Sequence, residues 1–319
     1  MSASFPARVP RQPACPGTAG EAAARLRLID RGPGKVDPED WDGTGNRGGG
    51  RTGLVQGQGY ARGTTMSSFG GIERVRRVWL DAVQAGPSLL QGHRIARNIP
   101  RLQGAAGPNR GLVDAAGSGG LLLRLLVIGD SNVAGTGAPT HSVALTGQLA
   151  VGLSARRHRP VAWEADGANG ATMERIRFEV LGLIQEHDPD IVVLVAGAND
   201  AMAGRSPARW GSDLRAVLGA FLDPGREREI VVAGVPPFRY FPALPAPLNE
   251  FLERRASRLD AVSAAVCAEL GLDFVSFADD PPLGDAFFAT DRFHSSVAGY
   301  GHWAGYLLDA LPDRDSNTG

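Results

Sequence analysis

From residue 120 onward, short apolar runs alternate with segments in which apolar residues recur at helical spacing. The run at 190–197 is apolar at nearly every position, which is typical of a central strand in a parallel sheet covered by helices on both faces. We therefore predict a three-layer α/β/α sandwich of flavodoxin-like type, with a five-stranded parallel sheet, over residues 120–312. The five predicted strands are 121–128, 161–165, 191–196, 230–235 and 274–277.

The first 65 residues show no sustained apolar period. They are rich in Gly, Arg, Pro and Asp, so they bury too little apolar surface to offset the entropy lost on ordering. We predict a disordered extension over residues 1–65. Because Met66 opens a segment with better helical character, an alternative is that the extension comes from an upstream start assignment.

Residues 66–119 combine a predicted helix with a linker. Apolar residues recur at helical spacing between 72 and 90 beside several arginines, which predicts a basic amphipathic helix. We expect this helix to pack on the main domain. The alternative is a weak contact with a membrane surface or a partner, which basic amphipathic helices also make. Residues 100–119, rich in Gly, Pro and Ala, are interpreted as a linker, and residues 313–319 as a polar tail.

Composition narrows the classes of function. The formal net charge of −1 gives no general attraction to nucleic acid. Two cysteines, Cys15 and Cys267, are too few for a disulfide framework, and their spacing suggests no metal site. No apolar stretch reaches the roughly 18 to 20 residues of a membrane-spanning helix, and the amino terminus lacks the order of a signal peptide. We expect a cytoplasmic protein, and the dominance of Arg over Lys suggests a GC-rich bacterial genome.

A turn after the first predicted strand carries a candidate nucleophile. Gly129-Asp130-Ser131-Asn132 places the Ser131 hydroxyl at the carboxyl end of a buried strand, where the functional crevice of such sheets lies. A serine hydroxyl is a poor nucleophile at neutral pH, so it needs a base and a group that orients the base. Asp291 and His294 are three residues apart, and on a tight helical or 3₁₀ turn both side chains point to one side. Alone, an Asp-x-x-His pair is typical of an ordinary turn. Together with the fragments earlier in the chain, it indicates an acid and a base for a catalytic serine.

Acyl transfer also needs donors for the negative charge that develops on the carbonyl oxygen. The candidates are the backbone N–H of Ser131, the backbone N–H of Gly170 and the side-chain amide of Asn199. Glycine suits the second position because it lets the backbone approach a substrate closely. Each of these residues alone also fits an ordinary turn. Their order along the chain, at or after predicted strand ends, favours an oxyanion hole.

These fragments together resemble the SGNH or GDSL family of serine esterases and lipases, over about residues 121–311. Gly129-Asp130-Ser131 resembles the first conserved block, with its serine nucleophile, and Gly170 the glycine of the second. Gly197-Ala198-Asn199-Asp200 is similar to the third block, while Asp291 and His294 resemble the acid and base of the fifth. The resemblance implies an SGNH-hydrolase fold and ester hydrolysis without a cofactor or a metal.

The first block departs from the family pattern at one position, where Asn132 stands in place of leucine. That position varies in the family, so the triad interpretation is unaffected, but nothing here identifies a lipase in the narrow sense. Esters, thioesters, acetylated sugars and lysophospholipids all remain open as substrates.

The proline-rich segment 235–248 follows the fourth predicted strand. Its apolar residues Phe238, Phe241 and Leu244 are candidates for the wall of an acyl pocket. The alternative is that the aromatic residues of this loop cap the sheet. Similar loops in bacterial members of the family favour the substrate side.

Other classes of function fit the sequence less well. The glycines at 129–137 have the wrong spacing for a dinucleotide or P-loop fingerprint, and the Gly-x-Ser-x-Gly elbow of α/β-hydrolases is absent. No His-Glu-x-x-His motif or cysteine pair indicates a metal hydrolase. A catalytically silent, flavodoxin-like binding module remains the alternative to an esterase, and the oligomeric state is open.

Overall fold

The computed structural model describes residues 100, 102–114, 120–179, 188–223, 225–278 and 284–311. The predicted extension at 1–65, the predicted helix at 72–90 and the polar tail at 313–319 lie outside these residues. Among the described residues, no helix is both long enough and apolar enough to cross a membrane.

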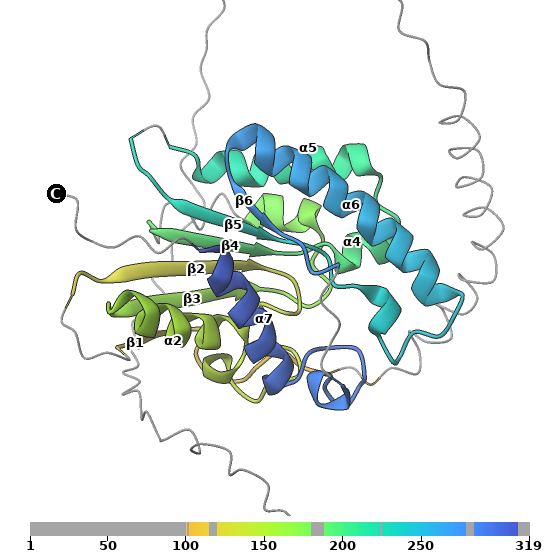
Figure 1. Cartoon of the computed structure of the whole chain (residues 1–319), viewed down its shortest axis with the longest axis horizontal. Helices are drawn as coiled ribbons and strands as arrows, with labels where there is room; N and C mark the ends of the chain where they lie inside the picture. The colour runs from red at the N-terminus through yellow and green to blue at the C-terminus, as the bar shows by residue number, and fades with distance from the viewer. Residues whose placement is uncertain are drawn as a thin grey trace, which may run out of the picture.

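The centre of the fold is a six-stranded sheet with the order β1-β3-β2-β4-β5-β6 (Figure 1). The five strands β3, β2, β4, β5 and β6 are parallel, which confirms the predicted fold class and the flavodoxin-like order. The strands are β1 (Arg110–Val113), β2 (Leu123–Gly129), β3 (Val161–Gly167), β4 (Ile191–Val195), β5 (Glu229–Ala233) and β6 (Asp273–Val275).

The sixth strand, β1, was not predicted, because its residues fall in the segment interpreted as a linker. It pairs antiparallel with β3, with Arg110 opposite Glu164 and Val113 opposite Val161. The indole of Trp163 lies so close to Gly111 that a Cβ there would stand 2.8 Å from Trp163 Cζ2. A strand this short with a glycine inside shows no recognisable alternation of apolar and polar residues. It forms because its backbone pairs with the free edge of β3.

Helices cover both faces of the sheet, as expected from strands that are apolar throughout (Figure 1). Along β2, Leu126 and Ile128 face the side of α5 and α6, while Leu125 and Val127 face the side of α2 and α7. The helices are α2 (Leu145–Arg157), α4 (Ala198–Ala203), α5 (Pro207–Phe221), α6 (Leu248–Leu270) and α7 (Val297–Ala310).

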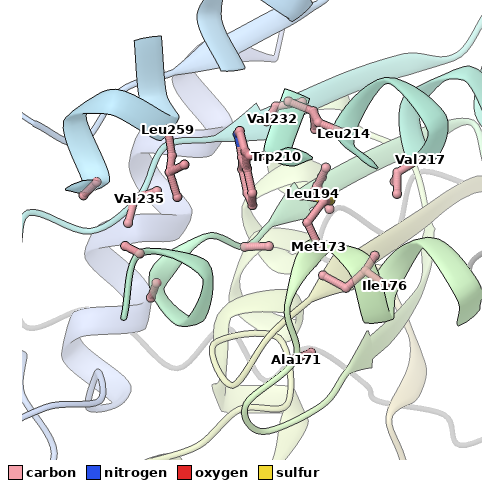
Figure 2. Close-up of a cluster of buried hydrophobic side chains, with 14 of the residues drawn as sticks. Ala171, Met173, Ile176, Leu194, Trp210, Leu214, Val217, Val232, Val235 and Leu259 are labelled. Carbon is pink, nitrogen blue, oxygen red and sulfur yellow. The ribbon is translucent and has the colours of Figure 1, made fainter. Parts of the chain in front are cut away.

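The core on the α5 and α6 side is centred on Trp210, which Figure 2 shows among Leu194, Val232 and Leu259. The Trp210 ring is buried, and its Nε1 donates a hydrogen bond of 2.9 Å to Ser263 Oγ on α6. A buried indole needs such a partner because an unpaired N–H would cost free energy. The pair therefore fixes α5 against α6 above the sheet.

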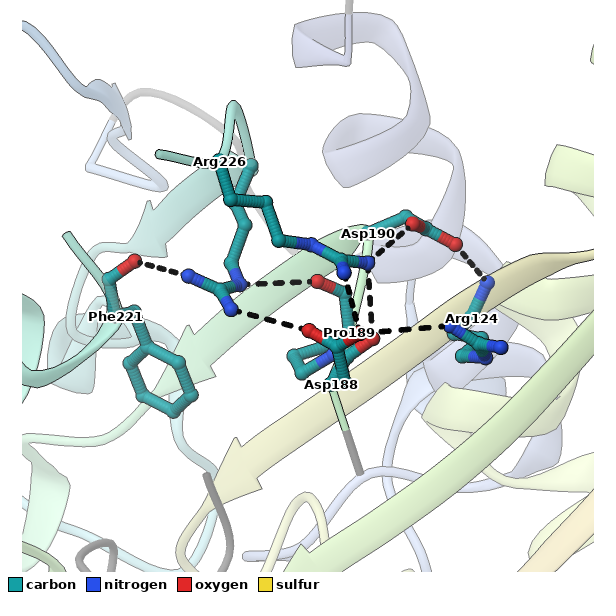
Figure 3. A network of polar contacts seen from close by, with 7 residues as sticks. Arg124, Asp188, Pro189, Asp190, Phe221 and Arg226 are labelled. Carbon is teal, nitrogen blue, oxygen red and sulfur yellow. Dashed lines mark hydrogen bonds and ion pairs between the residues drawn. The ribbon is translucent and has the colours of Figure 1, made fainter. Parts of the chain in front are cut away.

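The amino ends of the central strands are tied by a network of charged groups (Figure 3). The carboxylate of Asp190 accepts hydrogen bonds from the backbone N–H of Arg124 and from the Arg226 guanidinium, each at 2.8 Å. Arg226 also pairs with Asp188, which in addition accepts from Arg228. These contacts join β2, β4 and the segment before β5 at the amino-terminal end of the sheet. The candidate site lies at the opposite, carboxyl-terminal end.

The carboxyl ends of β2 and β4 meet at the point where the strand order reverses. The chain leaves β2 toward β3 on one side and leaves β4 toward β5 on the other. In open α/β sheets the crevice at such a switch point is the usual place for a ligand. Ser131 follows β2 and Asn199 follows β4, so the fold brings these two candidates to that point.

Candidate active site

The turn that carries Ser131 is held by its own backbone and by the neighbouring strand. The N–H groups of Val133 and Ala134 donate to Asp130 O, and Asp130 N donates to Val195 O at 3.1 Å. Gly129 has to be glycine, since a Cβ there would lie only 1.9 Å from Val195 O. The turn therefore starts where the backbone of β4 lies too close to β2 for a side chain to fit between them. The half-buried Ser131 hydroxyl takes part in no hydrogen bond within the described part of the chain, which leaves it available to a substrate or base.

Asn132 has a structural role that the sequence did not reveal. Its backbone N–H and its Nδ2 both donate to Asp130 Oδ1, at 3.0 and 3.1 Å. Burial raises the pKa of Asp130 to about 6, while the hydrogen bonds from Asn132 and the nearby His294 act in the opposite direction. Asp130 thus anchors the turn, since its carboxylate holds Asn132 and its backbone C=O holds the N–H groups of Val133 and Ala134.

Asp291 and His294 form the hydrogen-bonded pair that the sequence predicted. His294 Nδ1 lies 2.6 Å from Asp291 Oδ2, and Asp291 Oδ1 accepts the backbone N–H groups of Phe293 and His294. Burial, the largest influence, would raise the pKa of Asp291, but the hydrogen bonds from His294 and Phe293 bring it below its ordinary value. A buried Asp291 therefore stays ionised beside the imidazole at neutral pH.

The turn that holds this pair differs from the predicted helical or 3₁₀ turn. Arg292 lies in the left-handed region with φ = 57°, and its N–H donates to Ala289 O. The carboxylate of Asp291 supplies the remaining contacts by accepting amides two and three residues ahead, as aspartate side chains do in turns. Both side chains still reach the same side, for this different reason.

The loop of His294 packs against the turn of Ser131. A Cβ at Gly137 would lie 2.4 Å from Ser295 O, so the two segments touch there. Tyr300, on α7, donates its hydroxyl to Thr136 O at 2.6 Å. These contacts bring the candidate nucleophile and the candidate base to the same end of the sheet.

The two remaining oxyanion candidates are tied to each other. Asn199 Nδ2 donates to Ala171 O at 3.0 Å, one residue after Gly170. The next side chain on α4, Asp200, accepts the N–H of Met173 at 3.0 Å. Gly170 has φ = 77°, and a Cβ there would meet nothing within 4 Å. Its backbone conformation, rather than lack of space within the protein, is what favours glycine.

The proline-rich loop after β5 places its predicted substrate residues in the core. Phe238, Phe241 and Leu244 are all buried in the cluster on the α5 and α6 side. Phe241 packs edge-on against Phe293 with ring centroids 5.2 Å apart, and Phe293 packs in the same way against His294 at 5.1 Å. The loop therefore packs against His294 through Phe293. Direct contact of Phe238, Phe241 and Leu244 with a substrate stays a prediction.

No group of three or more His, Cys, Asp or Glu side chains suited to a metal ion occurs among the described residues. The site instead offers a hydroxyl, an imidazole paired with a carboxylate, and amide donors. That set of groups suits nucleophilic attack with proton transfer.

A family profile matches most of this domain. The GDSL-like Lipase/Acylhydrolase family matches residues 127–302, which include Ser131, Gly170, Asn199, Asp291 and His294. The chain belongs to this family. As a GDSL-like hydrolase it acts on ester bonds. Among curated proteins, no sequence matches the chain.

Solved structures similar to this GDSL-like hydrolase include TesA, with 22% identity and a TM-score of 0.48 over 59% of this chain and 97% of that one. A lipase/acylhydrolase from Enterococcus faecalis has 22% identity and a TM-score of 0.46, over 59% and 94% of the two chains. A carbohydrate acetylesterase from Sinorhizobium meliloti has 18% identity and a TM-score of 0.46, over 59% and 97%.

Three residues of this GDSL-like hydrolase contribute to the site without having been predicted. They are Thr136, Asn169 and Tyr300. Thr136 Oγ1 donates to Asn169 Oδ1, and Thr136 O accepts the Tyr300 hydroxyl. In the sequence, Thr136 and Asn169 look like ordinary turn residues and Tyr300 like one more apolar position of a helix. No spacing rule links them, so only the folded chain reveals the connection.

Proposed function

We propose that the protein is a serine-dependent acyl-ester hydrolase in which Ser131 is the nucleophile, His294 the general base and Asp291 the group that orients the base. The observation that carries this proposal is the 2.6 Å contact between His294 Nδ1 and Asp291 Oδ2, on a loop packed against the Ser131 turn. A carboxylate at Nδ1 holds the imidazole in the tautomer whose Nε2 accepts a proton.

The proposed reaction has two halves. Ser131 Oγ attacks the ester carbonyl carbon while His294 Nε2 takes the hydroxyl proton, and His294 then gives that proton to the leaving alcohol as the C–O bond breaks. Ser131 is now acylated. Water attacks the acyl carbon and loses a proton to His294, which returns it to Ser131 Oγ as the carboxylic acid leaves.

Negative charge develops on the carbonyl oxygen in both halves. We assign its stabilisation to the backbone N–H groups of Ser131 and Gly170 and to the side-chain amide of Asn199. The Asn199 amide has two N–H groups, and the bond to Ala171 O uses one, which leaves the other for the substrate. The open space at the Cβ position of Gly170 supports this assignment, because it leaves room beside this residue for a substrate.

The substrate we propose is a small or lipid-like acyl ester. Phe238, Phe241 and Leu244 are buried, so we propose that they shape the acyl side through Phe293, the ring between Phe241 and His294. Tyr240 is 38% exposed while Phe238 and Phe241 of the same loop are buried, so we propose Tyr240 as the aromatic residue of this loop that touches a substrate directly.

The test is hydrolysis of p-nitrophenyl esters, from acetyl to long acyl chains, by the full chain and by Ser131→Ala. We expect activity in the wild type, loss of at least about 1,000-fold in the variant, and a chain-length optimum that measures the pocket. Labelling by a fluorophosphonate, which needs an activated serine, should occur in the wild type and not in Ser131→Ala. A folded wild type that hydrolyses no ester and takes no label would instead be a silent binding module, and near-normal activity in Ser131→Ala would remove the mechanism.

A further inference from the structure

Thr136 lies five residues after Ser131 and connects three segments of the site. Its side chain is fully buried. Its backbone N–H donates to Ser131 O at 3.0 Å, its backbone C=O accepts the Tyr300 hydroxyl at 2.6 Å, and its Oγ1 bonds to Asn169 Oδ1 at 2.5 Å. One residue thus holds the main chain of the candidate nucleophile, the helix that follows the base, and the loop of the candidate oxyanion glycine.

The bond to Asn169 bears on the oxyanion hole. Asn169 immediately precedes Gly170 and is itself exposed, so little protein packing fixes its side chain. Within the part of the chain that the structure describes, its side chain makes two hydrogen bonds, the short one from Thr136 Oγ1 and a longer one, at 3.4 Å, from its Nδ2 to Leu102 O. Gly170 has open space at its Cβ position and a left-handed φ. The Thr136 hydroxyl therefore ties the residue next to this glycine to the turn of Ser131. The same loop is also held by the bond from Ala168 N–H to Gly129 O and by the bond from Asn199 to Ala171 O.

The bond to Tyr300 fixes Thr136 from the other side. Tyr300 lies on α7, which begins three residues after His294. Burial raises the pKa of Tyr300, with Asp130 and Asp291 acting in the same direction, so the phenol stays protonated and donates its hydrogen. Thr136 thus has a fixed position from which its hydroxyl can act.

We propose that Thr136 is a positioning residue for ester hydrolysis: through Asn169, its hydroxyl sets the place of the Gly170 N–H relative to Ser131. The inference rests on the proposed function, because it needs Ser131 as nucleophile and Gly170 as an oxyanion donor. Thr136 is buried and touches no substrate. Its effect falls on the transition state, since donors aimed at a developing oxyanion lose most of their value when displaced by about 0.5 to 1 Å.

Two replacements separate the hydroxyl from the volume of the side chain. Thr136→Val keeps the shape and removes the hydroxyl, and the exposed Asn169 regains water in place of the lost bond. Thr136→Ser keeps the hydroxyl and leaves a small cavity in a fully buried position. We expect Thr136→Val to retain the wild-type Tm within a few degrees and to lose about tenfold in kcat, with KM changed less than about twofold. Thr136→Ser should have the lower Tm of the two and a kcat within about threefold of wild type.

A double-mutant cycle on kcat then tests the route through Asn169, with p-nitrophenyl acetate as substrate and the full chain as protein. Asn169→Ala should lose about as much as Thr136→Val, and the double variant should lose no more than the larger single loss, since both remove one hydrogen bond. Asn169→Gln, which keeps an acceptor oxygen without adding a charge beside the oxyanion, should retain more activity than Asn169→Ala. If Thr136→Val does not fold, the comparison of these two exposed variants decides the question.

Each outcome bears on a distinct statement. Wild-type kcat in Thr136→Val, losses that multiply in the double variant, or equal losses for Asn169→Gln and Asn169→Ala would overturn the inference while leaving the proposed function intact. A wild type that neither hydrolyses the ester nor takes the fluorophosphonate label would overturn the proposed function, and the inference with it.

Discussion

Asp291 Oδ2 lies 2.6 Å from His294 Nδ1, while Oδ1 of the same carboxylate accepts the backbone N–H of His294. One side chain therefore fixes both the ring and the main chain of the candidate base. The backbone bond shapes a turn in which Arg292 has a left-handed φ, and the ring bond leaves Nε2 free to take a proton. Orientation of the imidazole is thus built in before a substrate binds.

Replacing Asp291 by Asn should reduce kcat by about 100-fold or more while the chain stays folded. An amide at this position can present its N–H to Nδ1, which favours the wrong tautomer of His294. The comparison is kcat on p-nitrophenyl acetate for Asp291→Asn and His294→Ala, with circular dichroism and Tm as the control. A kcat for Asp291→Asn equal to that of the wild type would show that Asp291 only shapes the turn.

Asn199→Ala should lower kcat by about 100- to 1,000-fold with little change in KM, the usual cost of removing one oxyanion donor. The side chain also holds Ala171 O, so part of any loss could come from movement of the Gly170 loop. Asn199→Asp does not separate loss of the oxyanion donor from movement of the loop. Its carboxylate would repel both the substrate oxyanion and Ala171 O.

A pair of matched variants, Gly170→Asn and Gly170→Val, tests whether the backbone conformation of that loop matters for activity. Both add a side chain into open space, but Asn tolerates a left-handed φ and Val does not. We expect the Asn variant to keep more activity. If both variants are equally impaired, the cause would be obstruction of the substrate rather than backbone strain.

Most of the architecture follows from the sequence because the central strands are buried on both faces, and residues such as Val192 and Val193 then leave a continuous apolar run. Part of the site can be predicted for the same reason. The strands are parallel, so the turns after them carry Ser131 and Asn199 to the same end of the sheet. The rest could not be predicted. The strand β1 forms only because it pairs with the edge of β3. The bond between Thr136 and Asn169 joins residues 33 positions apart, and no local sequence pattern marks it.

His158→Gly should stabilise the protein by about 1 kcal/mol. His158 ends α2 in the left-handed conformation, with φ = 49° and ψ = 41°, and its N–H caps Ser154 O. A Cβ is unfavourable in that conformation, and His158 is exposed, so glycine relieves strain without leaving a cavity. Urea denaturation measures the change, and His158→Ala is the control because it keeps the Cβ. A gain in both variants would point to the imidazole instead of the backbone.

Asp260 on α6 gives the protein a predictable dependence of stability on pH. Its carboxylate accepts the N–H of Val235 at 2.8 Å, and burial raises its pKa to about 7, with Glu253 acting in the same direction and the hydrogen bond against it. Because the folded chain then binds more protons than the unfolded chain between about pH 4 and 7, the free energy of unfolding falls as the pH rises through that window.

Asp260→Asn should therefore be more stable than the wild type at pH 8, by on the order of 1 to 4 kcal/mol, and close to it at pH 4. Asparagine keeps an oxygen for Val235 N–H and carries no charge at any pH. Burial also raises the pKa of Asp130 and of Asp200 to about 6, so the variant should retain a shallower slope below pH 6. Denaturation curves at both pH values measure the difference. Equal stability of the two proteins at pH 8 would mean that the ionised Asp260 carboxylate costs the fold nothing.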